Sequence, residues 1–168
     1  MKKLGLVILV LTAVSLAAQP KPDAQIAAMK KLDYMAGVWR GEGWIDMGGG
    51  KMTFRGSETI QRKLDGVALL VEGAFVDANN KPAHTTLAVM SFDPASQKYK
   101  FSTWLATGSS GVHDLTVNPD GWQWEIPTPT ATIRFTMKLT EAGEWLETGA
   151  RSADGKEWRQ FFEMRLKK

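Results

Sequence analysis

The sequence predicts an all-β protein: a closed antiparallel meander barrel of about ten strands with a short N-terminal helix. Two patterns support this prediction. After residue 36, apolar and polar residues alternate in segments of strand length, and turn-forming residues separate those segments at short, even intervals. A physical argument adds that the sheet closes, because an open meander exposes two edge strands that promote aggregation. A barrel of this size is wide enough to enclose a cavity.

Residues 1–18 predict a secretory signal peptide. Lys2 and Lys3 form a basic start, and the apolar run that follows is too short to span a bilayer. The small residues Ser15 and Ala17 suit a cleavage site. We therefore expect a periplasmic or secreted protein, and the alternative is an uncleaved membrane anchor.

The composition excludes several classes of protein. The chain of 168 residues has no cysteine, which excludes disulfides, thiolate metal sites, thiol nucleophiles and a lipid anchor on cysteine. We therefore expect no stable membrane insertion after signal removal. The formal charge of +3 less the two lysines of the signal peptide gives +1. A nearly neutral chain gives no electrostatic case for nucleic acid. The composition leaves the oligomeric state open.

Residues 19–36 predict a proline-containing linker followed by a short amphipathic helix. Asp23 can cap the start of this helix, and Gly37 suits the position just past its end. Four apolar residues recur on one side of the helix: Ile26, Met29, Leu32 and Met35. We expect the helix to pack on the barrel or to plug one end.

Residues 37–168 predict the barrel domain itself. In residues 131–139, for example, Ala, Ile, Phe, Met and Leu share one face, while Thr, Arg and Lys share the other. A two-sheet sandwich is an alternative, but the links stay short and no long crossover is evident. An outer-membrane barrel would need lipid-facing apolar bands, aromatic girdles and long loops. The polar faces here suit water outside the barrel.

The stretch AGVWRGEGW, residues 36–44, contains a Gly-x-Trp motif at the end of the helix and the start of the first strand. This arrangement resembles the calycin superfamily, which includes the lipocalins and fatty-acid-binding proteins. The resemblance implies that Gly37 and Trp39 help to close one end of the barrel. It also implies that an arginine of a late strand packs across the indole ring, and Arg159 and Arg165 are both candidates. Such a pair gains cation–π attraction.

The segments LDYMAGVWRGEGWI and KMTFRGSETI are similar to exported lipocalin-like bacterial proteins of unknown function and, more distantly, to the nitrobindin group of haem-binding barrels. The nitrobindin resemblance implies a haem bound through a histidine close to the C-terminus. Residues 160–165 read QFFEMR and contain no histidine. The expected axial ligand therefore has no counterpart at that position, and we expect no cofactor, with haem as the alternative.

The candidate ligand-binding residues combine polar groups on strands with tryptophans that could line a cavity. They are Glu72, His84, Trp104, His113, Trp122 and Trp124. Glu72 lies among apolar residues in ALLVEGAF, where an inward carboxylate would anchor a ligand's head group. Glu58, in RGSETI, is a further candidate of the same kind. The alternatives are a solvent-facing glutamate, structural histidines and tryptophans that pack the core.

The leading functional hypothesis is an exported barrel that holds a small, mostly apolar molecule. The sequence contains no Gly-x-Ser-x-Gly, phosphate loop, dinucleotide fingerprint or His-Glu-x-x-His motif, so we assign no catalytic residue. Two isolated histidines predict no metal site. The alternatives are haem or nitric-oxide binding, an enzyme that uses Glu72 and a histidine inside the barrel, and an envelope protein that acts through its surface.

Overall fold

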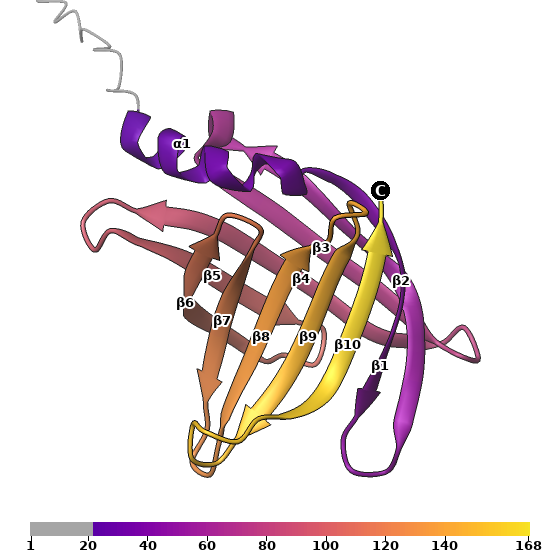
Figure 1. Ribbon diagram of the computed structural model, residues 1–168. Coiled ribbons are helices and arrows are strands. Elements are labelled where there is room, and N and C mark those ends of the chain that lie inside the picture. The colour runs from indigo at the N-terminus through magenta and orange to yellow at the C-terminus, as the bar shows by residue number, and fades with distance from the viewer. Residues whose placement is uncertain (1–21) are drawn as a thin grey trace, which may run out of the picture.

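The computed structural model describes residues 22–168, so the predicted signal peptide lies outside the described residues. A closed antiparallel barrel confirms the predicted fold class (Figure 1). Its strands are β1 (Gly37–Asp46), β2 (Lys51–Lys63), β3 (Ala68–Asp77), β4 (Pro82–Asp93), β5 (Lys98–Leu105), β6 (Ser110–Asn118), β7 (Gly121–Pro127), β8 (Thr132–Leu139), β9 (Trp145–Ser152) and β10 (Arg159–Lys167). A short 3₁₀ turn, η2 (Leu64–Gly66), joins β2 to β3.

The strands form a pure meander. Each strand pairs antiparallel with its neighbour in the sequence, and β1 pairs with β10 from Arg40 opposite Lys167 to Ile45 opposite Phe162. This last ladder removes both free edges, which is the physical advantage of closure over an open sheet. A two-sheet sandwich is thereby excluded.

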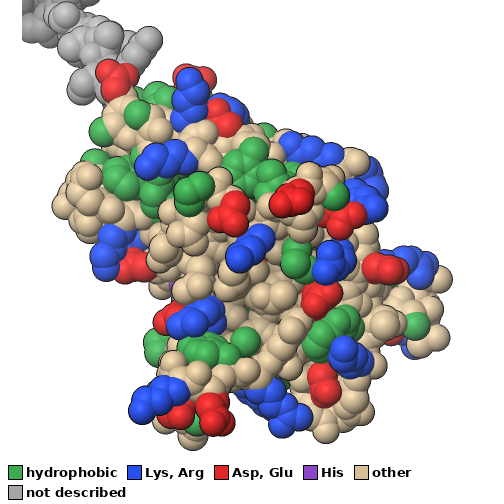
Figure 2. All heavy atoms as spheres, viewed as in Figure 1, with side chains coloured by type: hydrophobic (Ala, Val, Ile, Leu, Met, Phe, Trp, Pro, Cys, Tyr) green, Lys and Arg blue, Asp and Glu red, His purple; other side chains and the backbone are tan. Residues whose placement is uncertain are grey.

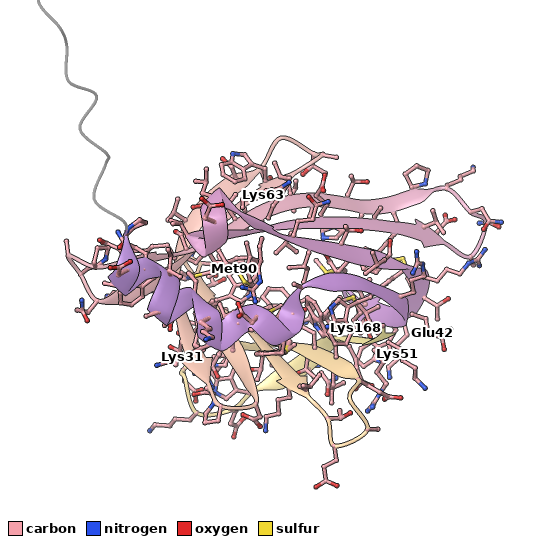
Figure 3. The ribbon with its side chains drawn as sticks, turned by 90° about the horizontal axis from the view of Figure 1, so that it is seen from above. Lys31, Glu42, Lys51, Lys63, Met90 and Lys168 are labelled. Atoms are coloured by element: carbon pink, nitrogen blue, oxygen red, sulfur yellow. The ribbon has the colours of Figure 1, made fainter. Side chains whose placement is uncertain are left out.

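The N-terminal helix has two parts, α1 (Asp23–Met29) and the 3₁₀ helix η1 (Lys30–Met35). Asp23 is the first helical residue and makes no capping hydrogen bond, so the predicted cap is wrong; Pro22 occupies that position. Met29 at the end of α1 is buried, as are Leu32 and Met35 of η1, whose spacing of three keeps them on one face of a 3₁₀ helix. Figure 3 looks down on this end and shows both helical segments crossing the barrel.

Buried tryptophans pack beneath these helices. Trp39 is 2 % exposed, and its ring meets the Trp145 ring edge-on at 5.7 Å between centroids. The Trp39 Nε1 donates a 2.7 Å hydrogen bond to the backbone carbonyl oxygen of Met35. The Nε1 of Trp122 lies 3.1 Å from the Met35 sulfur. These contacts place Trp39 directly beneath the helical segments, at the covered end of the barrel.

The predicted arginine partner of Trp39 is wrong. Arg159 and Arg165 are both exposed, and Arg165 pairs with Glu144 and Glu163 at 3.6 and 3.3 Å. The reason is strand alternation, because buried residues flank Arg165 on β10 and side chains of successive residues point to opposite faces.

Lys168 takes the place of the arginine. Its Nζ lies 4.9 Å from the centre of the Trp39 ring. Its side chain passes Gly37, where a Cβ would lie 3.3 Å from the Lys168 Cε. Gly37 also has a φ of +134°, a left-handed conformation that disfavours any other residue at the junction of η1 and β1.

Charged side chains are spread over the outer surface of the barrel. Lysine, arginine, aspartate and glutamate side chains are interspersed over the face shown in Figure 2. Ion pairs join adjacent strands, among them Lys100 with Asp114 at 2.5 Å and Arg134 with Glu125 at 2.7 Å. Within residues 22–168, no helix is long and apolar enough to cross a membrane.

Candidate functional site

The barrel encloses a cavity of about 510 Å³. Aromatic side chains form much of its wall, including Phe54, Phe101, Trp122, Trp124, Phe135 and Trp145. The rings of Trp124 and Phe135 are stacked with centroids 4.8 Å apart, so they present flat apolar surface along one side. Such a mostly apolar hollow with few polar groups is the usual form of a small-molecule site.

The cavity reaches the surface at the end opposite the helices. Ala83, His84, Ser109 and Ser110 all line the cavity and are all exposed. They belong to the ends of β4 and β6 and to the β5–β6 turn, which lie away from α1 in Figure 1. The barrel is therefore covered at one end and open at the other.

Two glutamates from opposite parts of the sequence face this cavity. Glu58 of β2 is only 9 % exposed, and Glu147 of β9 lies deep in the protein although part of its surface borders the cavity. Gly73 makes room for the first carboxyl group, because a Cβ at Gly73 would lie 2.8 Å from the Glu58 Oε1. The second carboxyl group accepts a 3.0 Å hydrogen bond from the Trp145 Nε1.

The surroundings favour the protonated form of both carboxyl groups. Burial raises the pKa of Glu58 to about 8, and the nearby charge of Glu147 adds to the effect. Burial raises the pKa of Glu147 to about 7, partly opposed by the hydrogen bond from Trp145. Glu58 is therefore mainly neutral at pH 7, and Glu147 is near its midpoint.

Two polar atoms at the cavity wall have no hydrogen-bond partner among the described residues. They are the Glu58 Oε2 and the Trp124 Nε1. An unsatisfied buried polar atom costs about 1–3 kcal/mol, so such atoms call for an explanation. A ligand or a water molecule in the cavity would supply the missing partners.

Two of the predicted ligand-binding residues lie outside the barrel. Glu72 is exposed, because Val71, Gly73 and Phe75 are the inward residues of β3. The prediction that Glu72 points inward is wrong, because along this part of the strand the odd-numbered residues face inward and the even-numbered ones face the solvent. Trp104 is 45 % exposed for the same reason, since the opposite face of β5 lines the cavity.

The other four predicted residues line the cavity: His84, His113, Trp122 and Trp124. The His113 ring packs against the Trp124 ring with centroids 4.7 Å apart. Partial desolvation beside the cavity lowers the pKa of both histidines from the ordinary value of 6.5, so both are mainly neutral at pH 7. Within residues 22–168, no group of three or more histidine, aspartate or glutamate side chains could hold a metal ion.

Sequence reasoning found one of the two inward glutamates and missed the other. Glu58 was a further candidate beside Glu72, and the structure favours it. The sequence-based predictions did not include Glu147. The alternation along β9 contained a signal for it, because Trp145, Glu147 and Gly149 share the inward face. A glutamate between a tryptophan and a glycine on one face of a strand indicates a candidate inward carboxyl group.

Residues 26–168 match the family described as "Protein of unknown function (DUF1579)". The chain belongs to the DUF1579 family. Among curated proteins, none matches this DUF1579 protein. The family assignment covers both helical segments after residue 25 and the whole barrel, so the candidate cavity lies entirely within it.

Solved structures with the same fold include two proteins of different origin. Rv2717c from M. tuberculosis has a TM-score of 0.61 at 14 % identity, over 83 % of this chain and 95 % of that one. The S-type phycobiliprotein lyase CPES from Guillardia theta has a TM-score of 0.51 at 10 % identity, over 83 % of this chain and 90 % of the other. At these identities the likeness establishes the barrel fold alone.

Proposed function

We propose that this DUF1579 protein binds a small, mostly apolar molecule inside its barrel. The supporting observation is the cavity of about 510 Å³, which is walled by aromatic rings and covered at one end. Its size lies in the range of about 300–1,000 Å³ that is usual for small-molecule sites. An occupant would gain about 25 cal/mol for each Å² of apolar surface that leaves water.

Native mass spectrometry tests this proposal directly. Protein purified from cells, and protein incubated with a lipid extract, should carry an added mass that denaturing conditions remove. Ala88, which is buried and lines the cavity, offers a variant that fills it: Ala88→Phe should lower the bound fraction. Val89→Phe, on the other face of the same strand, is the matched control and should keep it. A folded protein that never carries a ligand would reject the proposal.

We further propose that the protein acts in the periplasm or outside the cell. The support is the signal-peptide pattern of residues 1–18. Cell fractionation should place the protein outside the cytoplasm, and N-terminal sequencing should find a mature start close to residue 19. Protein that stays cytoplasmic with its first residues intact would contradict export.

Haem binding is the alternative that the nitrobindin resemblance raised. The residues fit this group poorly, because β10 contributes Phe161, Phe162 and Met164 to the cavity wall where that resemblance implies a histidine. His113 and His84 lie instead on β6 and β4. We expect a haem titration without a sharp Soret band. A band that disappears in His84→Ala or His113→Ala would establish haem as the ligand.

The enzyme hypothesis required Glu72 to lie inside the barrel. Glu72 is exposed and lies on the outer face of β3, so it cannot act on a molecule in the cavity. The inward carboxyl groups of Glu58 and Glu147 remain, and their role is considered next.

A further inference from the structure

We propose that the occupant of the cavity is an organic cation, an amine or a quaternary ammonium group on an apolar body, whose charge lies beside Glu58 and Glu147. This inference rests on the proposed function and names the chemical class of the ligand. Four properties of the cavity support it: its acidic pair, the lack of a countercharge, its aromatic walls and the unpartnered carboxyl oxygen.

The first two properties concern charge. The titratable side chains that line the cavity are Glu58 of β2, Glu147 of β9, His84 of β4 and His113 of β6; within the described chain the lining includes neither lysine nor arginine. The two histidines are mainly neutral at pH 7, because desolvation lowers their pKa. The protein therefore supplies no permanent positive charge to this acidic pair, and protons are its only neutralising partners before a ligand binds.

The aromatic walls suit a cation better than a neutral hydrocarbon. The face of an indole or phenyl ring attracts positive charge, by about 0.5–2 kcal/mol for each well-placed ring when water is excluded. Trp122, Trp124 and Trp145 line the same cavity as the two carboxyl groups. Aromatic rings combined with a carboxylate are the physical requirements for recognising an ammonium group.

The unpartnered carboxyl oxygen indicates where the charged group of a ligand would bind. The Glu58 Oε2 is buried without a hydrogen-bond partner among residues 22–168, at the wall of the cavity. An amine N–H group, or the polarised methyl groups of a quaternary ammonium, would satisfy it. An anionic head group such as a fatty-acid carboxylate is compatible only with the protonated pair, so rising pH should weaken its binding and strengthen that of a cation.

Cation binding and proton release are coupled in this site. A bound positive charge favours the ionised form of a carboxyl group and so lowers its pKa. Near neutral pH the free site holds a proton on Glu58 and, in about half of the molecules, on Glu147, so binding of a cation should release protons. Affinity should therefore rise with pH through the range in which Glu147, with a pKa of about 7, loses its proton.

The test compares a permanent cation with its uncharged isostere. The probes are benzyltrimethylammonium and neopentylbenzene, in which a carbon atom replaces the nitrogen. Tryptophan fluorescence follows binding, and calorimetry in two buffers of different ionisation enthalpy counts released protons. We expect the cation to bind about tenfold more tightly at pH 8 than at pH 6, with proton release, because the ionised fraction of a carboxyl group with a pKa of 7 changes by that factor. The isostere should show no pH dependence.

Variants distinguish the contribution of the glutamate charge to binding from the contribution of the cavity's shape. Glu147→Gln and Glu58→Gln should each weaken cation binding and flatten its pH dependence while the isostere binds as before. Glu72→Gln, an exposed glutamate on the strand next to Glu58, is the matched control and should change neither. Equal affinity for both probes at pH 8 overturns the cation assignment and leaves the proposed function intact. Binding of neither probe overturns the cation assignment, and native mass spectrometry then decides separately whether the barrel carries any other molecule.

Discussion

Lys168 and Trp39 meet at the covered end of the barrel, where the Lys168 Nζ lies 4.9 Å from the centre of the indole ring. The same ammonium group donates a 2.8 Å hydrogen bond to the backbone carbonyl oxygen of Tyr34. A residue just past β10 therefore joins the barrel to η1. Lys168 lies beside these helical segments in Figure 3.

Removing the ammonium group should loosen this junction. Lys168→Met keeps most of the apolar stem but loses the cation–π contact and the hydrogen bond to Tyr34. We expect the free energy of unfolding to fall by about 0.5–1.5 kcal/mol in urea titrations. Lys138→Met, on the exposed face of β8, is the control and should stay within about 0.5 kcal/mol of the parent. Equal values for the two variants would show that Lys168 contributes nothing specific.

Trp39 should be among the most sensitive positions of the core. Trp39→Ala leaves a large cavity beside Trp145 and leaves the carbonyl oxygen of Met35 without its donor. The free energy of unfolding should fall by about 3–5 kcal/mol. Trp104→Ala, at an exposed tryptophan, should cost less than about 1 kcal/mol. If Trp39→Ala abolished ligand binding at unchanged stability, the structural role assigned to Trp39 would be wrong.

The buried glutamates make stability depend on pH in an unusual direction. The folded pKa of Glu58 is about 8, above its ordinary value of 4.5, so between these values the folded state holds a proton that the unfolded state has lost. Stability should therefore fall as pH rises, with a slope of up to about 1.4 kcal/mol per pH unit for one such group. Urea unfolding between pH 6.5 and 8.5 measures it.

Two comparisons identify the source of that slope. The histidines work in the opposite direction, because desolvation lowers their pKa; their effect is nearly complete only about one pH unit above the ordinary value of 6.5, so the slope above about pH 7.5 belongs to the glutamates. Glu58→Gln should reduce the slope and raise stability at pH 8, since it removes the cost of a buried charge. Glu72→Gln should retain the parent slope. A parent protein that becomes more stable from pH 6.5 to 8.5 would contradict the assigned protonation states.

A side chain at Gly73 should displace the side chains packed against it. A Cβ there would lie 2.4 Å from the Thr86 Oγ1 and 2.8 Å from the Glu58 Oε1, so Gly73→Ala must push the carboxyl group into the cavity. We expect a loss of about 1–3 kcal/mol in unfolding free energy and weaker binding of any ligand seen by native mass spectrometry. Ala74→Ser, at the exposed neighbouring position, should change neither. Unaltered stability and binding in Gly73→Ala would refute the close packing.

The fold was accessible from the sequence, whereas two of the six predicted ligand-binding residues, Glu72 and Trp104, lie outside the cavity and Glu147 was missed. Alternation and turn residues predict strands, and the argument against free edges predicts closure. Whether an individual strand places its odd or even residues inside is a different problem. β3 carries small or apolar residues on both faces, so the pattern around Glu72 did not reveal that Val71 and Phe75 point inward. Because successive residues of a strand point to opposite faces, an error of one residue in the assignment placed Glu72 in the cavity instead of the solvent.

The sequence by itself determined the class of the protein: an apolar face on nearly every strand, short turns and a Gly-x-Trp start specify a barrel that buries one side of its sheet. Only the tertiary structure decided which charges share the interior. Glu58 and Glu147 come from strands far apart in the chain, and closure of the sheet brings both to one cavity. Burial then raises the pKa of each, because the low-dielectric interior penalises a charge that local sequence leaves in water.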